Sequence, residues 1–149
     1  MVKLVLKGEL NWVRTGEPDH KFDNETTKGK WSAQLLPDAE SLEIIRDLQA
    51  EGLKNVLKKN DENKYFTNFS RVFLKTGKEG KIIKTWTPPY TLDANNENLD
   101  PKILGNGSKG EIHLDVYEHP TPTGGKAKAA RLEGVKILEA VSRENRPSF

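Results

Sequence analysis

The sequence predicts a mainly β domain with a single helix. The clearest evidence lies in residues 111–117, where Ile112, Leu114 and Val116 alternate with polar side chains. A period of two buries one face of a strand and leaves the other face free. Similar alternation predicts further strands at residues 2–12, 30–36, 64–75, 81–87 and 131–138. One stretch has helical spacing, so we expect five or six strands, one helix and long loops.

The first part of the chain should form a long strand, a loop and a second strand. Gly8 lies near the middle of the strand at residues 2–12, which indicates a bulge or a sharp bend at the corner of a small barrel. Residues 15–29 are rich in Gly, Pro, Asp and Asn, so we expect a loop there. The second strand should turn one set of side chains inward, namely Trp31, Ala33 and Leu35.

The predicted helix runs from about residue 38 to residue 59. Asp38 or Ser41 can cap its first turn. Apolar residues recur at helical spacing and resume after Gly52. The last turn would hold Lys54, Lys58 and Lys59. Cations suit the negative end of the helix dipole, so we favour this capping role over a contact with DNA.

Residues 64–75 combine rings and cations on one face of a strand. One parity carries Tyr65, Phe69, Arg71, Phe73 and Lys75. Such a face suits an unpaired nucleic acid, because bases stack on rings at about 1–3 kcal/mol per base while cations pair with phosphates. The alternative is that Phe69 and Phe73 belong to the core. Arg71 and Lys75 favour the open face, since charged side chains are costly to bury.

The middle of the chain adds a hairpin and a long connection. Residues 76–81 predict a turn into the strand at 81–87, which carries Lys84 and Trp86. Trp86 either stacks on a base or closes the core. Residues 88–104 begin with two prolines, which cannot donate to a ladder, and should form a long irregular loop of a kind that is often functional.

The last two predicted strands flank a loop rich in Pro, Gly and Lys at residues 120–128. This loop is too polar to bury, and it is a plausible holder of a polyanion. A change of parity at Gly134 predicts a bulge in the last strand. The predicted contacts with single-stranded DNA are Lys30, Tyr65, Phe69, Arg71, Phe73, Lys75, Lys84, Trp86, Lys109, Lys126, Lys128 and Arg131.

These elements fit a small antiparallel barrel such as the OB-fold, with the helix placed between strands. The composition also allows a β-sandwich. We expect one domain over residues 1–141 and a flexible tail over residues 142–149. The net charge of +2, from 24 basic and 22 acidic residues, is not the global basicity of a histone-like protein. A nucleic-acid function must therefore depend on where the charges lie.

Several short motifs occur in order between Trp31 and Leu138. They are Trp31-Ser32-Ala33-Gln34-Leu35, Pro88-Pro89-Tyr90 followed by Asp93-Ala94, Gly105-Asn106-Gly107-Ser108, the strand ending at Tyr117, Gly124-Gly125-Lys126 and residues 132–138. This ordered set resembles bacteriophage single-stranded-DNA-binding proteins of the OB-fold type. The resemblance implies a protein that coats single strands during phage replication or recombination, in the cytoplasm of a bacterial host, without metal or nucleotide cofactor.

The tail departs from the pattern of that family. Its members often end in an acidic tail that occupies the DNA cleft and recruits replication proteins, whereas Arg143, Glu144 and Arg146 leave this tail slightly basic. Phe149 resembles the aromatic tip of those tails. It is therefore the predicted contact with phage or host replication proteins.

The sequence offers little for catalysis or for a membrane. His20, His113 and His119 are too scattered for a metal motif, and cysteine is absent. No apolar run approaches the roughly 18 residues that a membrane span needs. We therefore expect a protein that is not an enzyme and uses no cofactor. The alternative to DNA binding is a protein-interaction domain, an adaptor or structural component, which the small net charge favours.

Overall fold

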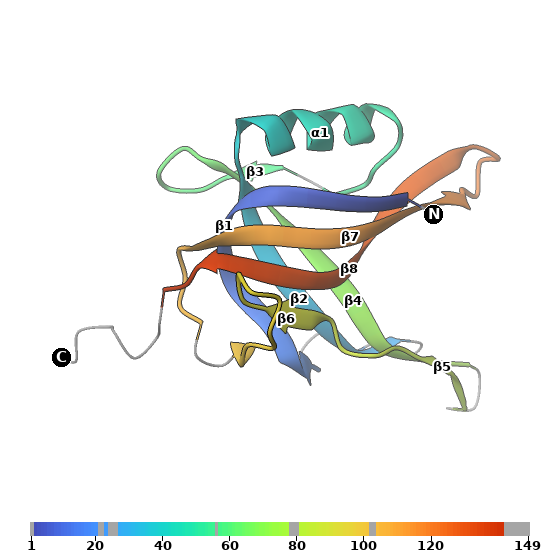
Figure 1. Ribbon diagram of the computed structural model, residues 1–149. Helices are drawn as coiled ribbons and strands as arrows, with labels where there is room; N and C mark the ends of the chain where they lie inside the picture. The colour runs from blue at the N-terminus through green and yellow to red at the C-terminus, as the bar shows by residue number, and fades with distance from the viewer. Residues whose placement is uncertain are drawn as a thin grey trace.

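The computed structural model describes residues 2–20, 23, 27–55, 57–77, 81–101 and 104–141. Within these ranges the chain forms eight strands and one helix (Figure 1). The strands are β1 (Val2–Asp19), β2 (Thr27–Pro37), β3 (Lys58–Lys59), β4 (Tyr65–Thr76), β5 (Ile82–Thr85), β6 (Tyr90–Leu92), β7 (Ser108–Pro120) and β8 (Lys126–Glu139). Helix α1 spans Ala39–Ala50 and lies beside the barrel, above β1 in Figure 1.

Five strands close into a barrel. β1 is central, because it pairs antiparallel with β2 on one side and with β7 on the other. β2 continues to β4 and β7 continues to β8. A parallel bridge between Ser70 of β4 and Arg131 of β8 closes the ring. This is the OB-fold arrangement, as the sequence predicted, with β3, β5 and β6 as additional short strands.

The inward parity of the barrel strands fills a single core. Trp31, Ala33 and Leu35 are all buried, as the alternation in β2 predicted. Ile112 and Leu114 of β7 meet them from the opposite wall, and Ile45 closes the core from the helix. No helix in the described ranges is long and apolar enough to cross a membrane.

The predicted helix was too long. It ends at Ala50, and the N–H groups of Glu51, Gly52 and Leu53 donate back to carbonyls of its last turn. Leu53 then forms a bridge to Lys128 of β8, so its apolar side chain is buried by the barrel and not by a further helical turn. Lys58 and Lys59 form β3, which pairs with the start of β4.

Two predicted loops also contain strand. β1 continues to Asp19 and β2 begins at Thr27, so most of the described part of residues 15–29 is extended. The turn-forming residues predicted a long loop there. β1 accommodates them through irregular pairing: its register with β2 shifts after Asn11 and again after Arg14. In the predicted connection at 88–104, residues 90–92 form β6, which pairs parallel with β8.

A bulge is present at one of the two glycines where the sequence predicted an irregularity, namely Gly134. The register of β7 and β8 shifts between His113 and Leu114, which leaves Glu133 next to Gly134 as the extra residue. Gly8 is in regular register with both neighbours, so of the two irregularities predicted there, a bulge or a sharp bend, the bulge is absent. The irregularity of β1 lies at Trp12, which has a φ of 50° and is 51% exposed.

Gly8 and Gly110 are instead positions of close approach. They pair with each other across β1 and β7. A Cβ on Gly8 would lie 2.0 Å from the carbonyl oxygen of Leu36, and one on Gly110 would lie 2.1 Å from the carbonyl oxygen of Lys136. Backbone atoms cannot rotate away as a side chain can, so the barrel needs glycine at both positions.

Replacing Gly110 by alanine should therefore destabilise the fold. We expect Gly110→Ala to lower the free energy of unfolding by about 1–3 kcal/mol, because the strands must separate to admit the methyl group. Urea denaturation measures the change. Gly125→Ala is the matched control, since a Cβ there meets only the Thr121 hydroxyl at 3.4 Å. Equal stability of the two variants would contradict the claim that the close backbone contact requires glycine at position 110.

Candidate nucleic-acid interface

Two aromatic rings and two cations form a cluster where β5, β7 and β8 come together. The guanidinium of Arg131 lies 5.1 Å from the centre of the Tyr117 ring and 5.9 Å from that of Trp86. The ammonium of Lys84 lies 4.9 Å from the Trp86 ring. We call Lys84, Trp86, Tyr117 and Arg131 the stacking cluster. Cations over ring faces are attracted by the negative charge of the π system.

Local structure holds each member of this cluster in place. Trp86 follows β5, and its backbone N–H donates to the carbonyl of Phe73 at 2.8 Å, which keeps the segment against β4. Tyr117 pairs in register with Ala129 of β8. Arg131 is fixed by the bridge that closes the barrel. Three of the four residues therefore lie on strands, and Trp86 lies directly after one.

A lysine-rich hollow adjoins the stacking cluster. It has a volume of about 400 Å³ and lies over the outer face of β4. Its cations are Lys30, Lys54, Lys58 and Lys128, and we call it the lysine hollow. Phe66 and His119 add rings to its wall. The ammonium of Lys128 is 3.2 Å from a carboxylate oxygen of Glu51, whereas Lys30, Lys54 and Lys58 are exposed.

The two features form one continuous surface. Ser70, which lines the lysine hollow, is the bridge partner of Arg131 in the stacking cluster. Ala129, also in the hollow, is the register partner of Tyr117. Lys75 pairs in register with Lys84 and extends the surface along β5. The hairpins of β7–β8 and β4–β5 project on the same side of the barrel (Figure 1).

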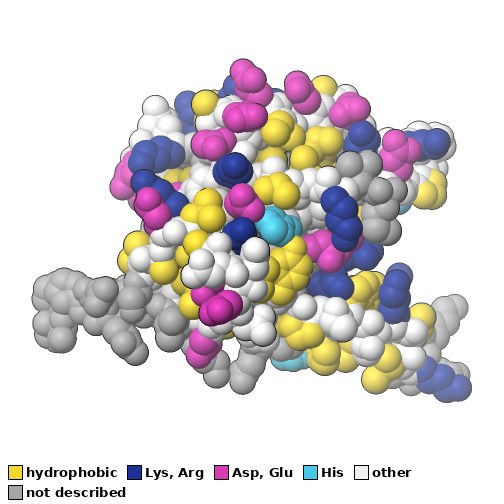
Figure 2. Space-filling view, in the orientation of Figure 1, with side chains coloured by type: hydrophobic (Ala, Val, Ile, Leu, Met, Phe, Trp, Pro, Cys, Tyr) yellow, Lys and Arg dark blue, Asp and Glu magenta, His cyan; other side chains and the backbone are white. Residues whose placement is uncertain are grey.

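Charge is segregated on the molecule. Acidic side chains gather over α1 at the top of Figure 2, and several Lys and Arg side chains lie between the two hairpins at the right. Glu40, Glu43 and Asp47 of the helix are all exposed. A polyanion would be repelled by the helix and attracted to the region between the hairpins. A small net charge is therefore compatible with a local cationic surface.

A carboxyl pair lies beneath the stacking cluster. Asp115 is buried, pairs in register with Arg131, and forms an ion pair of 3.2 Å with the exposed Lys3. A hydrogen bond between the carboxyls of Asp115 and Glu133 lowers the pKa of Asp115 and raises the pKa of Glu133, and burial adds to the rise at Glu133. Glu133 therefore holds its proton to a higher pH than an ordinary glutamate does.

Phe69 is not part of this surface, so the prediction that it stacks on bases is wrong. Its side chain is 1% exposed and belongs to the hydrophobic core. Thr67 is buried with the same parity, and so the inward face of β4 is the face predicted to be open. The sequence could not decide this, because a shift of one residue exchanges the two faces of a strand.

Arg71 is committed to the protein itself. Its Nε donates to the Thr87 carbonyl at 2.8 Å, and its Nη1 lies 3.5 Å from a carboxylate oxygen of Glu133. The side chain is only 10% exposed. The predicted phosphate contact is therefore wrong, since these partners satisfy the guanidinium and tie β4 to the segment after β5.

Phe73, Tyr65 and Lys109 also lie outside the stacking cluster and the lysine hollow. Phe73 packs edge-on against the buried Trp31, with ring centres 5.5 Å apart. Tyr65 is contacted by Arg46 and Lys59, at 5.0 and 5.1 Å from its ring centre. Lys109 lies at the other end of β7, eight residues before Tyr117 or about 26 Å along the strand.

The remaining predicted residues lie on or beside the candidate surface. Lys30 and Lys128 line the lysine hollow, and Lys84, Trp86 and Arg131 form most of the stacking cluster. Lys126 is exposed on the β7–β8 hairpin, 3.9 Å from Glu118. Phe149 lies outside the described residues.

Sequence reasoning missed Tyr117, Phe66, Lys54 and Lys58. Tyr117 had a usable signal, because it lies on the polar parity of an alternating strand where an aromatic ring is unusual. Lys54 and Lys58 were interpreted as a helix cap, and once the helix ends at Ala50 that role disappears. Phe66 was missed because the sequence analysis assigned the open face of β4 to the residues of the other parity.

Comparison with known proteins identifies the fold. No model of a protein family matches the chain, and no curated protein sequence matches it. Among solved structures, gp2.5, a single-stranded DNA binding protein encoded by bacteriophage T7, superposes with a TM-score of 0.67 over 100% of this chain and 99% of that chain, at 14% identity. The chain has the fold of this phage protein.

A second phage protein shows the same likeness. The single-stranded DNA-binding protein from bacteriophage Enc34, in complex with ssDNA, gives a TM-score of 0.59 at 15% identity over 93% of this chain and 87% of that chain. A C-terminal truncation of the Enc34 protein gives a TM-score of 0.56 at 16% identity, over 99% of this chain and 87% of that chain. At these identities the shared property is the fold.

The carboxyl pair predicts a pH dependence of stability. Because the pKa of Glu133 is raised on folding, the folded protein binds a proton that the unfolded chain has released, and the free energy of unfolding should fall as pH rises through this raised pKa. The lowered pKa of Asp115 acts in a separate range, since its stabilisation is lost as pH falls through that lowered value.

Glu133→Gln tests this assignment. The amide can donate to Asp115 at every pH, so the loss of stability as pH rises through the raised pKa of Glu133 should disappear. Urea denaturation across this range provides the measurement, with Glu43→Gln on the exposed face of α1 as the control. An unchanged pH profile in Glu133→Gln would show that the proton is held elsewhere.

Proposed function

We propose that this protein binds single-stranded DNA across the stacking cluster and the lysine hollow, without catalysing a reaction. The observation that carries the proposal is the continuity of the two features: rings with cations over them adjoin a hollow with several lysines on one surface. The fold shared with two phage single-stranded-DNA-binding proteins supports the same function.

The chemistry of the surface suits an unpaired strand. Tyr117 and Trp86 offer ring faces on which bases can stack, and every base has such a face, so binding would be largely independent of sequence. Lys30, Lys54 and Lys58 would pair with phosphates along the strand. In a duplex the bases are already stacked and paired, which leaves only the phosphate contacts. The surface should therefore prefer single strands.

Such a protein would coat and protect exposed strands during phage DNA replication or recombination. It would act in the cytoplasm of the bacterial host. It would also contact phage or host replication proteins through residues 142–149, with Phe149 as the contact residue. Comparing the full chain with a version that ends at residue 141, in pull-downs with purified polymerase, tests the tail separately from DNA binding.

Loss of a ring from the stacking cluster should weaken DNA binding. We expect Trp86→Ala and Tyr117→Ala each to reduce the affinity for oligo-dT by about tenfold, which corresponds to about 1–3 kcal/mol per stacked base. Fluorescence anisotropy of a labelled oligo-dT measures the affinity. Trp12→Ala removes another exposed aromatic ring, located at the bulge of β1, and is expected to bind normally.

Two results would contradict this assignment. Equal loss in Trp12→Ala would place the bases elsewhere on the barrel. Absence of binding by the unmodified protein at low salt would favour the protein-interaction domain instead.

The lysine hollow should control the salt dependence. Each phosphate contact releases counterions, so each of Lys30→Ala, Lys54→Ala and Lys58→Ala should reduce the slope of log affinity against log salt by about 0.7. The matched control is Lys64→Ala, an exposed lysine outside the hollow, for which the slope should not change. Unchanged slopes in all three variants would remove the hollow from the DNA path.

A further inference from the structure

Tyr90 carries an aromatic ring that belongs to neither the stacking cluster nor the lysine hollow. It is the first residue of β6, and its register partner on β8 is Gly134. A Cβ on Gly134 would overlap three adjacent atoms of the Tyr90 ring, namely Cγ, Cδ1 and Cε1. The ring therefore lies flat over the glycine, with one face against the sheet. Tyr90 is nevertheless 39% exposed, so the opposite face of its ring is open to water. We call this open face the Tyr90 platform.

Hydrogen bonds hold the ring in this orientation. The Nε2–H of His113 donates to a carboxylate oxygen of Glu111 at 3.0 Å, which leaves Nδ1 of His113 to accept from the Tyr90 hydroxyl. The imidazole also packs edge-on against the Tyr90 ring, with ring centres 5.6 Å apart. Pro89, the residue before Tyr90, is buried. A ring fixed in this way loses little further freedom when a ligand stacks on its open face.

The Tyr90 platform lies on the same outer face of the barrel as the stacking cluster. His113 and Tyr117 share the outward parity of β7, and four residues of a strand separate them by about 13 Å. The chain sets a second limit, because Trp86 and Tyr90 are four residues apart and their Cα atoms are therefore at most about 14 Å apart. An OB-fold binds about 4–16 nucleotides of a single strand, which is enough to span both positions.

Opposite charges nearly balance on this outer face. Its described cations are Lys3, Lys7, Arg131 and Lys136, and its described carboxylates are Glu111, Asp115 and Glu133. Each carboxylate has a partner within 3.5 Å, namely His113 for Glu111, Lys3 for Asp115 and Arg71 for Glu133. The face neither repels a polyanion nor attracts it strongly. Any affinity at the Tyr90 platform must therefore come from stacking.

From this arrangement we infer that the Tyr90 platform is a further base-stacking position, occupied by a base of the same single strand that binds the stacking cluster. The inference rests on the proposed function and extends the DNA path along β8, from Arg131 to Gly134. A nucleobase suits the platform because it is planar and uncharged, and because stacking requires only a free ring face.

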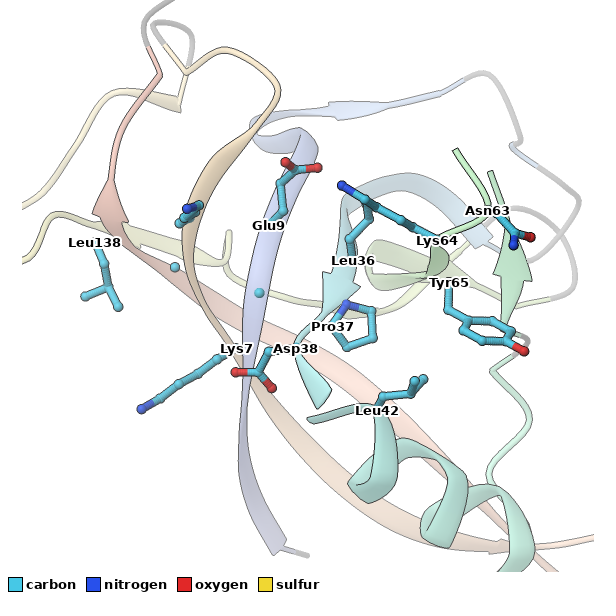
Figure 3. A pocket seen from close by; sticks show the side chains of 13 residues that line it. Lys7, Glu9, Leu36, Pro37, Asp38, Leu42, Asn63, Lys64, Tyr65 and Leu138 are labelled. Carbon is cyan, nitrogen blue, oxygen red and sulfur yellow. The ribbon is translucent and has the colours of Figure 1, made fainter. Parts of the chain in front are cut away.

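A groove elsewhere on the barrel supplies a matched control. It has a volume of about 590 Å³ and lies between the start of α1 and Leu138, with Tyr65 on its wall (Figure 3). The described residues that line it include Lys109 but neither Tyr90 nor a member of the stacking cluster. Tyr65→Ala therefore removes the same kind of side chain at a position outside the inferred DNA path.

Tyr90→Ala should weaken the binding of a long oligonucleotide. In fluorescence anisotropy we expect about tenfold lower affinity for a labelled oligo-dT of about 16 nucleotides. The slope of log affinity against log salt should not change, because the substitution removes no phosphate contact. An oligo-dT of about 4 nucleotides, which the stacking cluster alone can hold, should bind Tyr90→Ala normally.

Two variants separate the ring from other effects. Tyr90→Phe keeps the ring and loses only the hydrogen bond to His113, so its affinity should stay within about twofold of that of the unmodified protein. Tyr65→Ala should bind both oligonucleotides normally. Thermal melting of each variant verifies its fold.

A photochemical cross-link detects the contact without any substitution. Oligo-dT with 5-iodouracil in place of single thymines forms cross-links on irradiation to aromatic rings that stack on the modified base. Mass spectrometry of the unmodified protein should find such cross-links at Tyr90 as well as at Trp86 and Tyr117, and none at Tyr65. This measurement does not depend on the stability of Tyr90→Ala.

Three results would overturn the inference. One is normal affinity of a folded Tyr90→Ala for the long oligonucleotide, and another is the absence of cross-links at Tyr90; either would leave this ring to a different partner, such as a protein. The third is an equal loss of affinity in Tyr65→Ala. Failure of the proposed function is a separate result, because the unmodified protein then binds oligo-dT of neither length, and the inference falls with it.

Discussion

The parallel bridge between Ser70 and Arg131 is the contact on which this structure depends. It closes a five-stranded barrel, and closure removes two strand edges that would otherwise expose unpaired backbone groups. It also fixes Arg131 where β4 and β8 meet. From that position the guanidinium reaches Tyr117 on one neighbouring strand and Trp86 on the segment after β5. The same contact that completes the fold therefore assembles the rings and cations of the candidate site.

Closure also decides which side chains remain available. Phe69 and Trp31 enter the barrel and become core, and Arg71 is drawn into hydrogen bonds with the segment that carries Trp86. The outward parity of β4 then faces Lys30 and the residues after α1, where it forms the lysine hollow. An aromatic ring on a β-strand has two possible environments that differ by one residue of register. The hydrophobic effect of filling the core selects between them.

The two surfaces of the barrel divide the charges of a nearly neutral chain. The acidic face of α1 and the lysine hollow occupy different regions, so a net charge of only +2 coexists with a local cationic surface. The cations of the lysine hollow therefore lie away from the exposed acidic side chains of α1. Long strands also keep distant surfaces apart, because β7 extends from Lys109 in the groove to Tyr117 in the stacking cluster.

The sequence by itself determined the fold class and much of its local structure. Period-two alternation identified the barrel strands, the inward side chains of β2 and the bulge beside Gly134, because these depend on neighbours along the chain. The sequence also identified Lys30, Lys84, Trp86, Lys128 and Arg131 as candidate DNA-binding residues. Only the tertiary structure decided that Phe69 is core, that the helix ends at Ala50 and that Tyr117 joins Trp86 around Arg131. These outcomes depend on contacts between residues far apart in the chain, and such contacts exist only once the barrel has closed.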